Sequence, residues 1–139
     1  MIVLDTNVLS ELIRPNASPA VRAWFDTQPA DRLATSAVTA GEMLAGVERL
    51  PVGRRRRALS EEVTVLLHED FAGRVMPFDL AAVGEYAVVM ATRQQAGRPI
   101  SVLDAQIAAI CRNRGARLAT RNIADFEDTG VELINPWEA

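Results

Sequence analysis

The sequence has little that could crosslink the chain or carry it into a membrane. Cys111 is the only cysteine among 139 residues, which excludes an intramolecular disulfide, and its place in the apolar run 107–111 predicts a buried thiol in a reducing compartment. The N-terminus offers only Ile2–Leu4 before Asp5, which is too short for the apolar region of a signal peptide. No stretch approaches the roughly 18 apolar residues of a membrane span. We therefore expect a cytoplasmic protein without membrane contact.

Aromatic residues and net positive charge are also scarce. Aromatics make up 5% of the chain and the net charge is −3, so the protein as a whole is not a general polyanion binder. Basic residues are nevertheless clustered at Arg54–Arg57. This run is either the solvated start of a helix or a contact for RNA phosphates or for acidic groups of a partner protein. With 49% apolar residues, the composition fits one compact domain over residues 1–139.

Short apolar runs alternate with helical patterns along the chain. We expect strands over 2–4, 33–35, 75–77, 117–120 and 131–134, and helices over 6–13, 19–27, 39–50, 54–71, 80–96 and 102–114. Strands that alternate with helices predict an α/β fold with a parallel sheet covered on both faces. In such sheets, ligands bind outside the carboxyl ends of the strands.

Acidic and polar residues from four segments lie near the predicted carboxyl ends of strands. Asp5 follows the first strand, Glu42 lies in the helix after the second, Asp104 begins the helix before the fourth, and Asn122 and Asp125 follow the fourth. Carboxylates held this close repel one another unless a cation lies between them. Their oxygens suit Mg²⁺ or Mn²⁺. The pattern therefore predicts a divalent metal site that can activate water for phosphodiester hydrolysis.

Each of these residues also has an ordinary structural interpretation. Asp5 can cap the helix that follows it, a role compatible with metal binding. Asp104 lies three residues after Ser101 and can belong to a capping box, although the apolar residues around it favour a buried carboxylate that needs a partner. Glu42 lies opposite the main apolar face of its helix, so spacing alone would leave it in solvent. Segment 120–126 fits a capped turn.

Four motifs in the chain resemble those of PIN-domain ribonucleases, specifically the VapC-type toxins of toxin–antitoxin pairs. They are residues 2–7 (IVLDTN), 35–46 (TSAVTAGEMLAG), 104–109 (DAQIAA) and 119–126 (ATRNIADF), and the ending at 135–137 (NPW) resembles the FitB-like branch. Each motif is weak alone, but together they occur in order and span essentially the whole chain. The resemblance implies a three-layer α/β/α PIN-like fold with a mostly parallel five-stranded central sheet, and it implies Mg²⁺- or Mn²⁺-dependent cleavage of RNA.

The same resemblance assigns roles to individual residues. Asp5, Glu42 and Asp104 match the three acids that bind metal and catalyse cleavage. The fourth position, usually Asp, is Asn122 here; an amide can coordinate through its oxygen but lacks the charge, which would weaken a second metal unless Asp125 supplies it. Further residues are expected around these ligands or, for the two arginines, against the RNA backbone: Thr6, Asn7, Thr120, Arg112 and Arg121.

The implied partners are an RNA substrate, a second copy of the chain, and a small cognate antitoxin whose DNA-binding domain contacts operator DNA. The apolar residues on several faces of the predicted helix 39–50 also favour a homodimer. Two functions follow. The first is a toxin that hydrolyses RNA with metal-activated water. The alternative is a catalytically weak PIN-fold protein that acts mainly as the dimeric partner of a small DNA-binding repressor. Asn122 favours the alternative, whereas the three retained acids favour the enzyme.

Overall fold

The computed structural model describes residues 1–139 and contains one sheet of five short strands. The strands lie in the order β3-β2-β1-β4-β5, and every neighbouring pair is parallel. The elements in chain order are β1 (Ile2–Leu4), α1 (Thr6–Leu12), α2 (Pro19–Asp26), β2 (Leu33–Ser36), α3 (Ala37–Glu48), α4 (Arg54–Val65), β3 (Val75–Met76), α5 (Leu80–Gln95), α6 (Val102–Arg114), β4 (Arg117–Ala119), α7 (Ile123–Phe126) and β5 (Leu133–Ile134).

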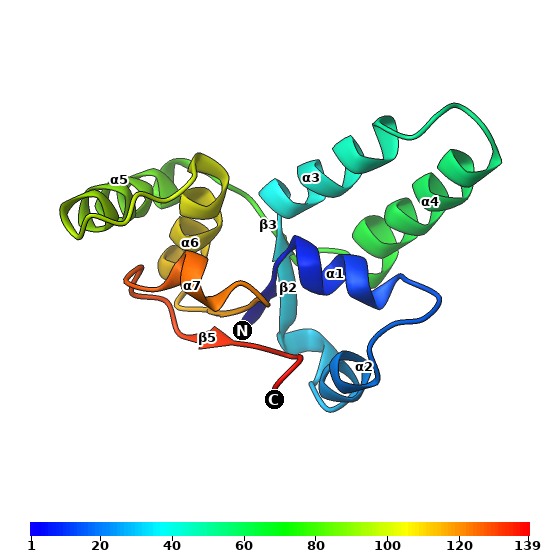
Figure 1. Ribbon diagram of the computed structural model, residues 1–139, viewed down its shortest axis with the longest axis horizontal. Coiled ribbons are helices and arrows are strands. Elements are labelled where there is room, and N and C mark those ends of the chain that lie inside the picture. The colour runs from blue at the N-terminus through cyan, green and yellow to red at the C-terminus, as the bar shows by residue number, and fades with distance from the viewer.

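Side chains of the strands alternate between two apolar cores. In β1, Ile2 and Leu4 pack into one core with α1 to α4, whereas Val3 packs into the other with α5, α6 and Phe126 of α7. Figure 1 shows these two groups of helices on opposite sides of the sheet. The predicted three-layer α/β/α fold is confirmed, and its sheet is parallel throughout.

The register of the sheet brings three strand ends to one level. Leu4 of β1 lies opposite Thr35 of β2 and Ala119 of β4. The residues that follow these strands therefore leave the sheet side by side, and the amide of Asp5 donates to the Ala119 carbonyl at 3.1 Å. This carboxyl edge is where the acidic residues of the chain meet.

Most predicted helices and strands are confirmed, with shifts of a few residues at their ends. The expected helix 54–71 is interrupted: α4 ends at Val65 and a π-helical turn, Leu66–Asp70, follows and buries Leu66, Leu67 and Phe71. The helix expected over 39–50 begins earlier, because the Ser36 hydroxyl accepts from the Thr39 amide and caps α3. Two short elements were not predicted, a 3₁₀ turn over Ala30–Arg32 and α7. None of the helices combines the length and apolar character that crossing a bilayer requires.

Candidate active site

Asp5 lies at the junction of β1 and α1 and is buried, with 5% of its surface exposed. It is the N-cap of α1: its Oδ1 accepts a hydrogen bond from the Val8 amide at 3.1 Å. Burial raises the pKa of this carboxyl from 3.8 to about 6, hydrogen bonds from Thr120, Val8 and Asn7 partly offset the rise, and the nearby Asp104 adds to it. Asp5 is therefore a helix cap whose charged form is costly in the absence of a cation.

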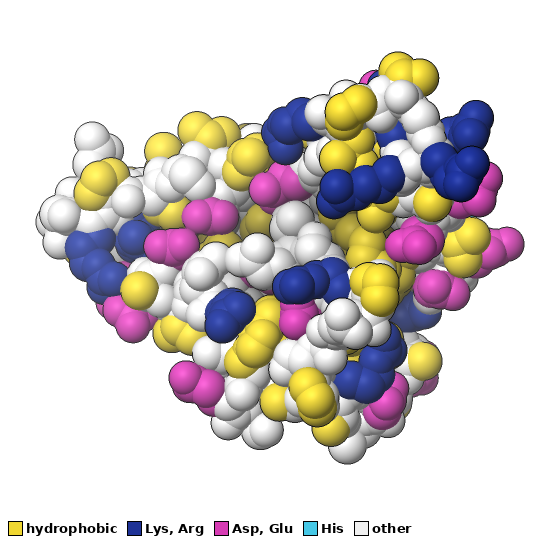
Figure 2. Space-filling view, turned by 45° about the vertical axis from the view of Figure 1, so that its right-hand side comes forward, with side chains coloured by type: hydrophobic (Ala, Val, Ile, Leu, Met, Phe, Trp, Pro, Cys, Tyr) yellow, Lys and Arg dark blue, Asp and Glu magenta, His cyan; other side chains and the backbone are white.

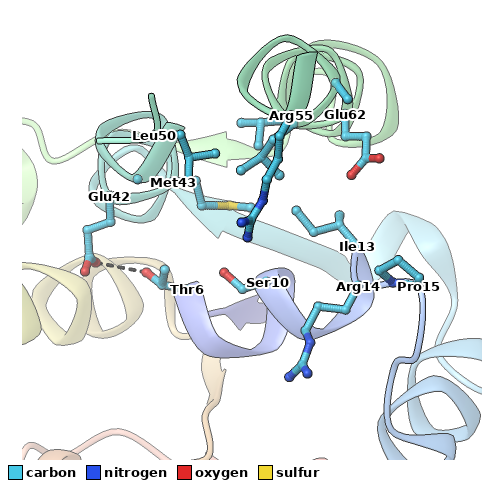
Figure 3. Close-up of a pocket in the computed structure, with 14 residues that line it drawn as sticks. Thr6, Ser10, Ile13, Arg14, Pro15, Glu42, Met43, Leu50, Arg55 and Glu62 are labelled. Carbon is cyan, nitrogen blue, oxygen red and sulfur yellow. Dashed lines mark hydrogen bonds between the residues drawn. The ribbon is translucent and has the colours of Figure 1, made fainter. Parts of the chain in front are cut away.

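Glu42 points from α3 towards α1 instead of into solvent. Its Oε1 accepts from the Thr6 hydroxyl at 2.9 Å, a contact drawn in Figure 3. Thr6, expected near the ligands, thus lies beside Glu42, and its hydroxyl bonds Glu42 and not Asp5. The periodicity of α3 could not show this, because the partner of Glu42 lies on another helix. Glu42 is thus held at the carboxyl edge by Thr6 of α1, the residue that directly follows Asp5.

Asp104 lies in the first turn of α6. The Ser101 hydroxyl accepts from the Asp104 amide at 3.2 Å, so the predicted cap is present. Partial burial raises the pKa of the Asp104 carboxyl. A side-chain hydrogen bond from Ser101 to the carboxyl lowers this pKa, the charges of Asp125 and Glu42 raise it further, and the charge of Arg93 lowers it. Acids from α3, α6 and α7 therefore lie close enough to repel one another.

Asn122 and Asp125 reach the same edge from α7. Asn122 is the residue before the helix, and its amide donates to the Thr120 hydroxyl at 3.0 Å. Both side chains are exposed, and both line the pocket that also contains Asp5 and Asp104. The short helix α7 thus places Asp125 in the same pocket as Asn122, where its carboxylate can supply the charge that Asn122 lacks.

The acidic residues and their neighbours share one small pocket of about 170 Å³. The pocket is lined by Asp5, Thr6, Asn7, Glu42, Asp104, Ile107, Asn122, Asp125 and Phe126. No lysine or arginine lines it. In this conformation no three Asp, Glu, His or Cys side chains are arranged so that they alone could hold a metal ion, so water would have to complete the coordination. The donors are hard oxygens with unfavourable mutual repulsion, and Mg²⁺ binds few protein carboxylates while keeping several waters. The residues present therefore fit a partly hydrated divalent cation.

The family of the chain follows from its sequence as well as from this geometry. Residues 2–132 match the family described as PIN domain. The chain belongs to the PIN-domain family. It is 42% identical to VapC ribonuclease Y4jK of Sinorhizobium fredii and 35% identical to Toxin FitB of Neisseria gonorrhoeae, each over 99% of both chains. The solved structure of FitAB bound to the IR36 DNA fragment matches with a TM-score of 0.93 at 36% identity, covering 99% of this chain and 96% of that one. These relatives place the chain among nucleases of the VapC and FitB toxin type.

The two arginines predicted to contact RNA occupy different places in this PIN domain. Arg112 lies at the amino ends of β4 and β5, where it pairs with Glu85 at 2.6 Å and donates to the Thr129 carbonyl at 3.0 Å. Arg112 therefore lies at the edge of the sheet opposite to the acids, because α6 begins at the carboxyl edge with Asp104 and runs towards the opposite edge. A Cβ atom at Gly130 would lie 2.2 Å from Arg112 Nη1.

Arg121 directly precedes Asn122 at the carboxyl edge. Its guanidinium lies 4.9 Å from the ring centroid of Trp137. Arg121 makes no ion pair within the chain, so its donors are available to a ligand. Cys111, the predicted buried thiol, is buried: this burial, reinforced by the charge of Asp5, raises the pKa of the thiol to about 12.

A groove of about 510 Å³ between α1 and the α3–α4 pair adjoins the acidic pocket. Thr6 and Glu42 line both cavities, and Figure 3 shows the Arg55 side chain extending from α4 into the groove. Basic side chains gather around this end of the molecule in Figure 2. Of the Arg54–Arg57 run, Arg55 lines the groove and Arg56 pairs with Glu48. Sequence patterns did not predict the groove, because it forms between helices and not on one of them.

Proposed function

We propose that this PIN domain is a Mg²⁺- or Mn²⁺-dependent endoribonuclease and the toxin of a type II toxin–antitoxin pair, with residues 1–139 acting as one domain. One observation carries the proposal: oxygen ligands from β1–α1, α3, α6 and α7 share a 170 Å³ pocket that no basic side chain lines. The name of the ribonuclease relative, which is 42% identical, supports RNA as the substrate.

Asp5, Glu42 and Asp104 would hold the ion. When bound, a divalent ion supplies the Lewis acidity that activates water and screens a phosphodiester. The chain itself orients the ligands: Thr6 donates to one oxygen of Glu42 and leaves the other free, while the Val8 amide holds Asp5. We also propose Asn122 and Asp125 as further candidate metal ligands, and Asn7 and Thr120 as residues that surround and orient the ligands.

RNA would approach across the carboxyl edge. Ile107 and Phe126 form the apolar wall of the pocket and exclude water from that side. We assign a phosphate contact to Arg121, whose guanidinium is stacked on Trp137 and has no internal ion pair. Removing such a contact weakens RNA binding without changing the metal site.

Cleavage of a natural RNA mixture by the purified protein tests the proposal. We expect cleavage with Mn²⁺ or Mg²⁺, none with EDTA, and loss of cleavage in Asp104→Asn. Glu132→Gln is the matched control, because Glu132 lies at the opposite edge of the sheet and pairs only loosely with Arg117 at 4.0 Å. Cleavage that persists in EDTA, or that is equal in Asp104→Asn and wild type, would contradict the proposed site.

We further propose a small antitoxin as partner, with operator DNA bound through it. The support is the likeness to Toxin FitB and to a FitAB complex solved on DNA. The groove beside the pocket is a suitable surface for an antitoxin segment, since a chain lying there would cover Glu42. The DNA-bound likeness also keeps the alternative function open, in which the chain is mainly the dimeric partner of a DNA-binding repressor.

The proposed homodimer has a candidate surface near the carboxyl edge. Three helices leave apolar side chains exposed there: Leu44 on α3 (42%), Leu80 on α5 (87%) and Leu103 on α6 (47%). The first two of these helices follow the carboxyl ends of β2 and β3, and the third begins beside Asp104. We expect light scattering at micromolar concentration to show a dimer and Leu80→Arg to dissociate it. Val52→Arg, at an equally exposed apolar residue in the α3–α4 loop, is the control; a wild-type monomer would contradict the dimer.

A further inference from the structure

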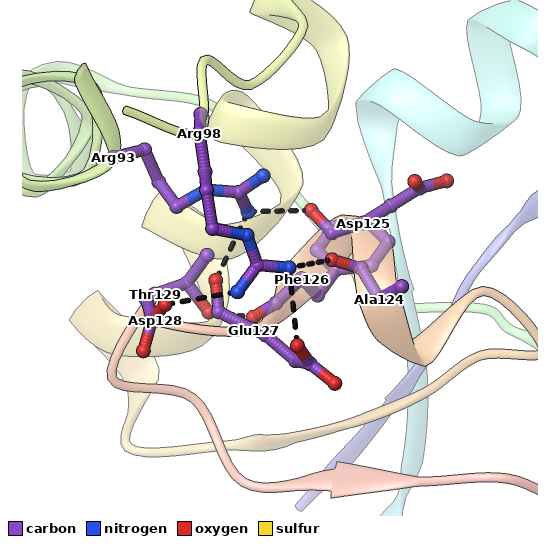
Figure 4. Close-up of polar contacts among 8 residues, drawn as sticks. All are labelled: Arg93, Arg98, Ala124, Asp125, Phe126, Glu127, Asp128 and Thr129. Atoms are coloured by element: carbon purple, nitrogen blue, oxygen red, sulfur yellow. Dashed lines mark hydrogen bonds and ion pairs between the residues drawn. The ribbon is translucent and has the colours of Figure 1, made fainter. Parts of the chain in front are cut away.

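Arg93 on α5 is a buried arginine without an acidic partner. Only 4% of its surface is exposed, and it forms no ion pair. Its guanidinium donates only to main-chain carbonyls: Nε to Arg98 at 2.6 Å, and Nη1 to Asp125 at 2.7 Å and Glu127 at 3.0 Å. Figure 4 shows the guanidinium lying against the end of α7. Burying a charge is costly unless its donors are satisfied, and here main-chain carbonyls alone satisfy them. This arrangement indicates that Arg93 has a structural role at the segment whose carbonyls it contacts.

The segment that Arg93 contacts is a very short helix. Helix α7 has four residues, too few for independent stability, and its N-cap makes no side-chain hydrogen bond. The carbonyls at its carboxyl end carry partial negative charge, which a cation stabilises. The planar guanidinium suits two carbonyls of one turn better than a lysine would. The Thr129 hydroxyl bonds the Phe126 carbonyl at 2.6 Å, and Arg93 supplies from α5 the contact with the Asp125 carbonyl.

Two other arginines also contact this segment, but less directly. Arg98 donates from outside to the Ala124 carbonyl and pairs with Glu127 and Asp128, in exposed contacts that are weak individually. Arg112 holds the Thr129 carbonyl further along the same loop, away from the pocket. Of these three arginines, only Arg93 is both buried and bonded to Asp125, whose side chain lines the acidic pocket.

We propose that Arg93 is a positioning residue of the metal pocket: by holding α7 at the Asp125 and Glu127 carbonyls, it keeps the Asp125 side chain facing Asp104. This inference rests on the proposed function, in which the pocket binds a divalent cation. The sign of the effect is informative. The positive charge of Arg93 by itself disfavours a nearby cation, so removing the charge alone would tighten metal binding. Losing the position of Asp125 weakens it instead.

Mn²⁺ titration of the purified full chain by calorimetry tests the inference. We expect Arg93→Gln to weaken Mn²⁺ binding by about tenfold, the lower end of the range for residues that orient metal ligands, and Arg93→Lys to weaken it less. Arg112→Gln is the matched control, because it also frees one carbonyl of the loop, and its Mn²⁺ affinity should stay within about twofold of wild type. Equal or tighter binding in Arg93→Gln would overturn the inference.

A double-mutant cycle separates positioning from general loss of stability. If Arg93 acts through Asp125, Arg93→Gln should not weaken Mn²⁺ binding any further in an Asp125→Ala background, although its melting temperature will still fall. An undiminished effect in that background would overturn the inference. If Arg93→Gln does not fold, the cycle is run with Arg93→Lys, which keeps the charge.

The proposed function fails by a different result. Wild type that does not bind Mn²⁺, or Asp104→Asn that binds it like wild type, would overturn the metal site itself and the role of Arg93 with it. Wild type that binds while Asp104→Asn does not, together with unaffected binding in Arg93→Gln, would overturn only the role of Arg93.

Discussion

Asp5→Asn should make the metal-free protein more stable. The folded-state pKa of Asp5, about 6, lies above its unfolded value of 3.8 because burial disfavours the charged form. Between these values the folded protein binds more protons than the unfolded chain, so the free energy of unfolding falls as the pH rises from about 4 to about 6. The raised pKa of Asp5 therefore lowers the free energy of unfolding by about 3 kcal/mol at neutral pH.

An asparagine can fill this position without that cost. Asn caps helices as well as Asp does, so its Oδ1 can still accept from the Val8 amide. The Thr120 hydroxyl can accept from its amide group, since a hydroxyl both donates and accepts. We therefore expect Asp5→Asn to be about 3 kcal/mol more stable than wild type above pH 7 in EDTA, a rise in Tm of roughly 8–10 °C.

Urea and thermal unfolding from pH 4 to pH 8 measure this difference. It should be near zero at pH 4, grow through pH 6 and then level off. Mn²⁺ should reverse the ranking, because an ion at a thousand times its Kd stabilises the wild type by about 4.1 kcal/mol and the variant by much less. Asp79→Asn is the matched control: Asp79 caps α5 through the Ala82 amide but lies outside the site, so its effect should be small at every pH. A pH-independent difference in Asp5→Asn would refute the reasoning.

Two further changes are informative. Asn122→Asp adds a charge beside Asp104, so it should tighten binding of a second metal and raise the cleavage rate. If Asp125 supplies the charge that Asn122 lacks, Asp125→Ala should lower metal affinity and cleavage more in the wild type than in Asn122→Asp. Independent effects of the two changes in metal titrations and cleavage assays would exclude compensation between these positions. Gly130→Ala should lower stability by about 1–3 kcal/mol, because the residue has a φ of +76° and its methyl group would collide with the guanidinium packed against it. Gly84→Ala in α5, where a methyl group meets open space, should be neutral or stabilising in the same urea assay.

The parts of the fold that the sequence predicts well are those with strong local signals. Helix α6 was expected over 102–114 and has these bounds, because Ser101 caps its start and Gly115, at a φ of 60°, ends it in the left-handed region. The strands were found as short apolar runs. Helix α7 was missed because four residues are too few to show a helical period. The π-helical turn was missed because its apolar residues continue the pattern of α4.

The site was predictable only in part, for a similar reason. Asp5 and Asp104 combine a cap signal with apolar surroundings, so sequence alone favours a second role for them. Glu42 depends on Thr6, which is 36 residues away, and no pattern within α3 contains that contact. Arg93 is harder still to predict: its neighbours in the chain, Thr92 and Gln94, are exposed, and two of its three acceptors are carbonyls 32 and 34 residues further on. Carbonyl partners carry no side-chain signature.

The four segments that supply the pocket residues, at α1, α3, α6 and α7, differ in how firmly the fold holds them. Helices α1, α3 and α6 each begin with a side-chain cap, from Asp5, Ser36 and Ser101, and the first two follow central strands whose register is shared. Helix α7 has no such cap and relies on contacts from α5. A change at Asn122 can therefore alter metal binding with little effect on the sheet. A change at Asp5 must alter both, because one carboxylate is at once a helix cap, a buried charge and a candidate ligand.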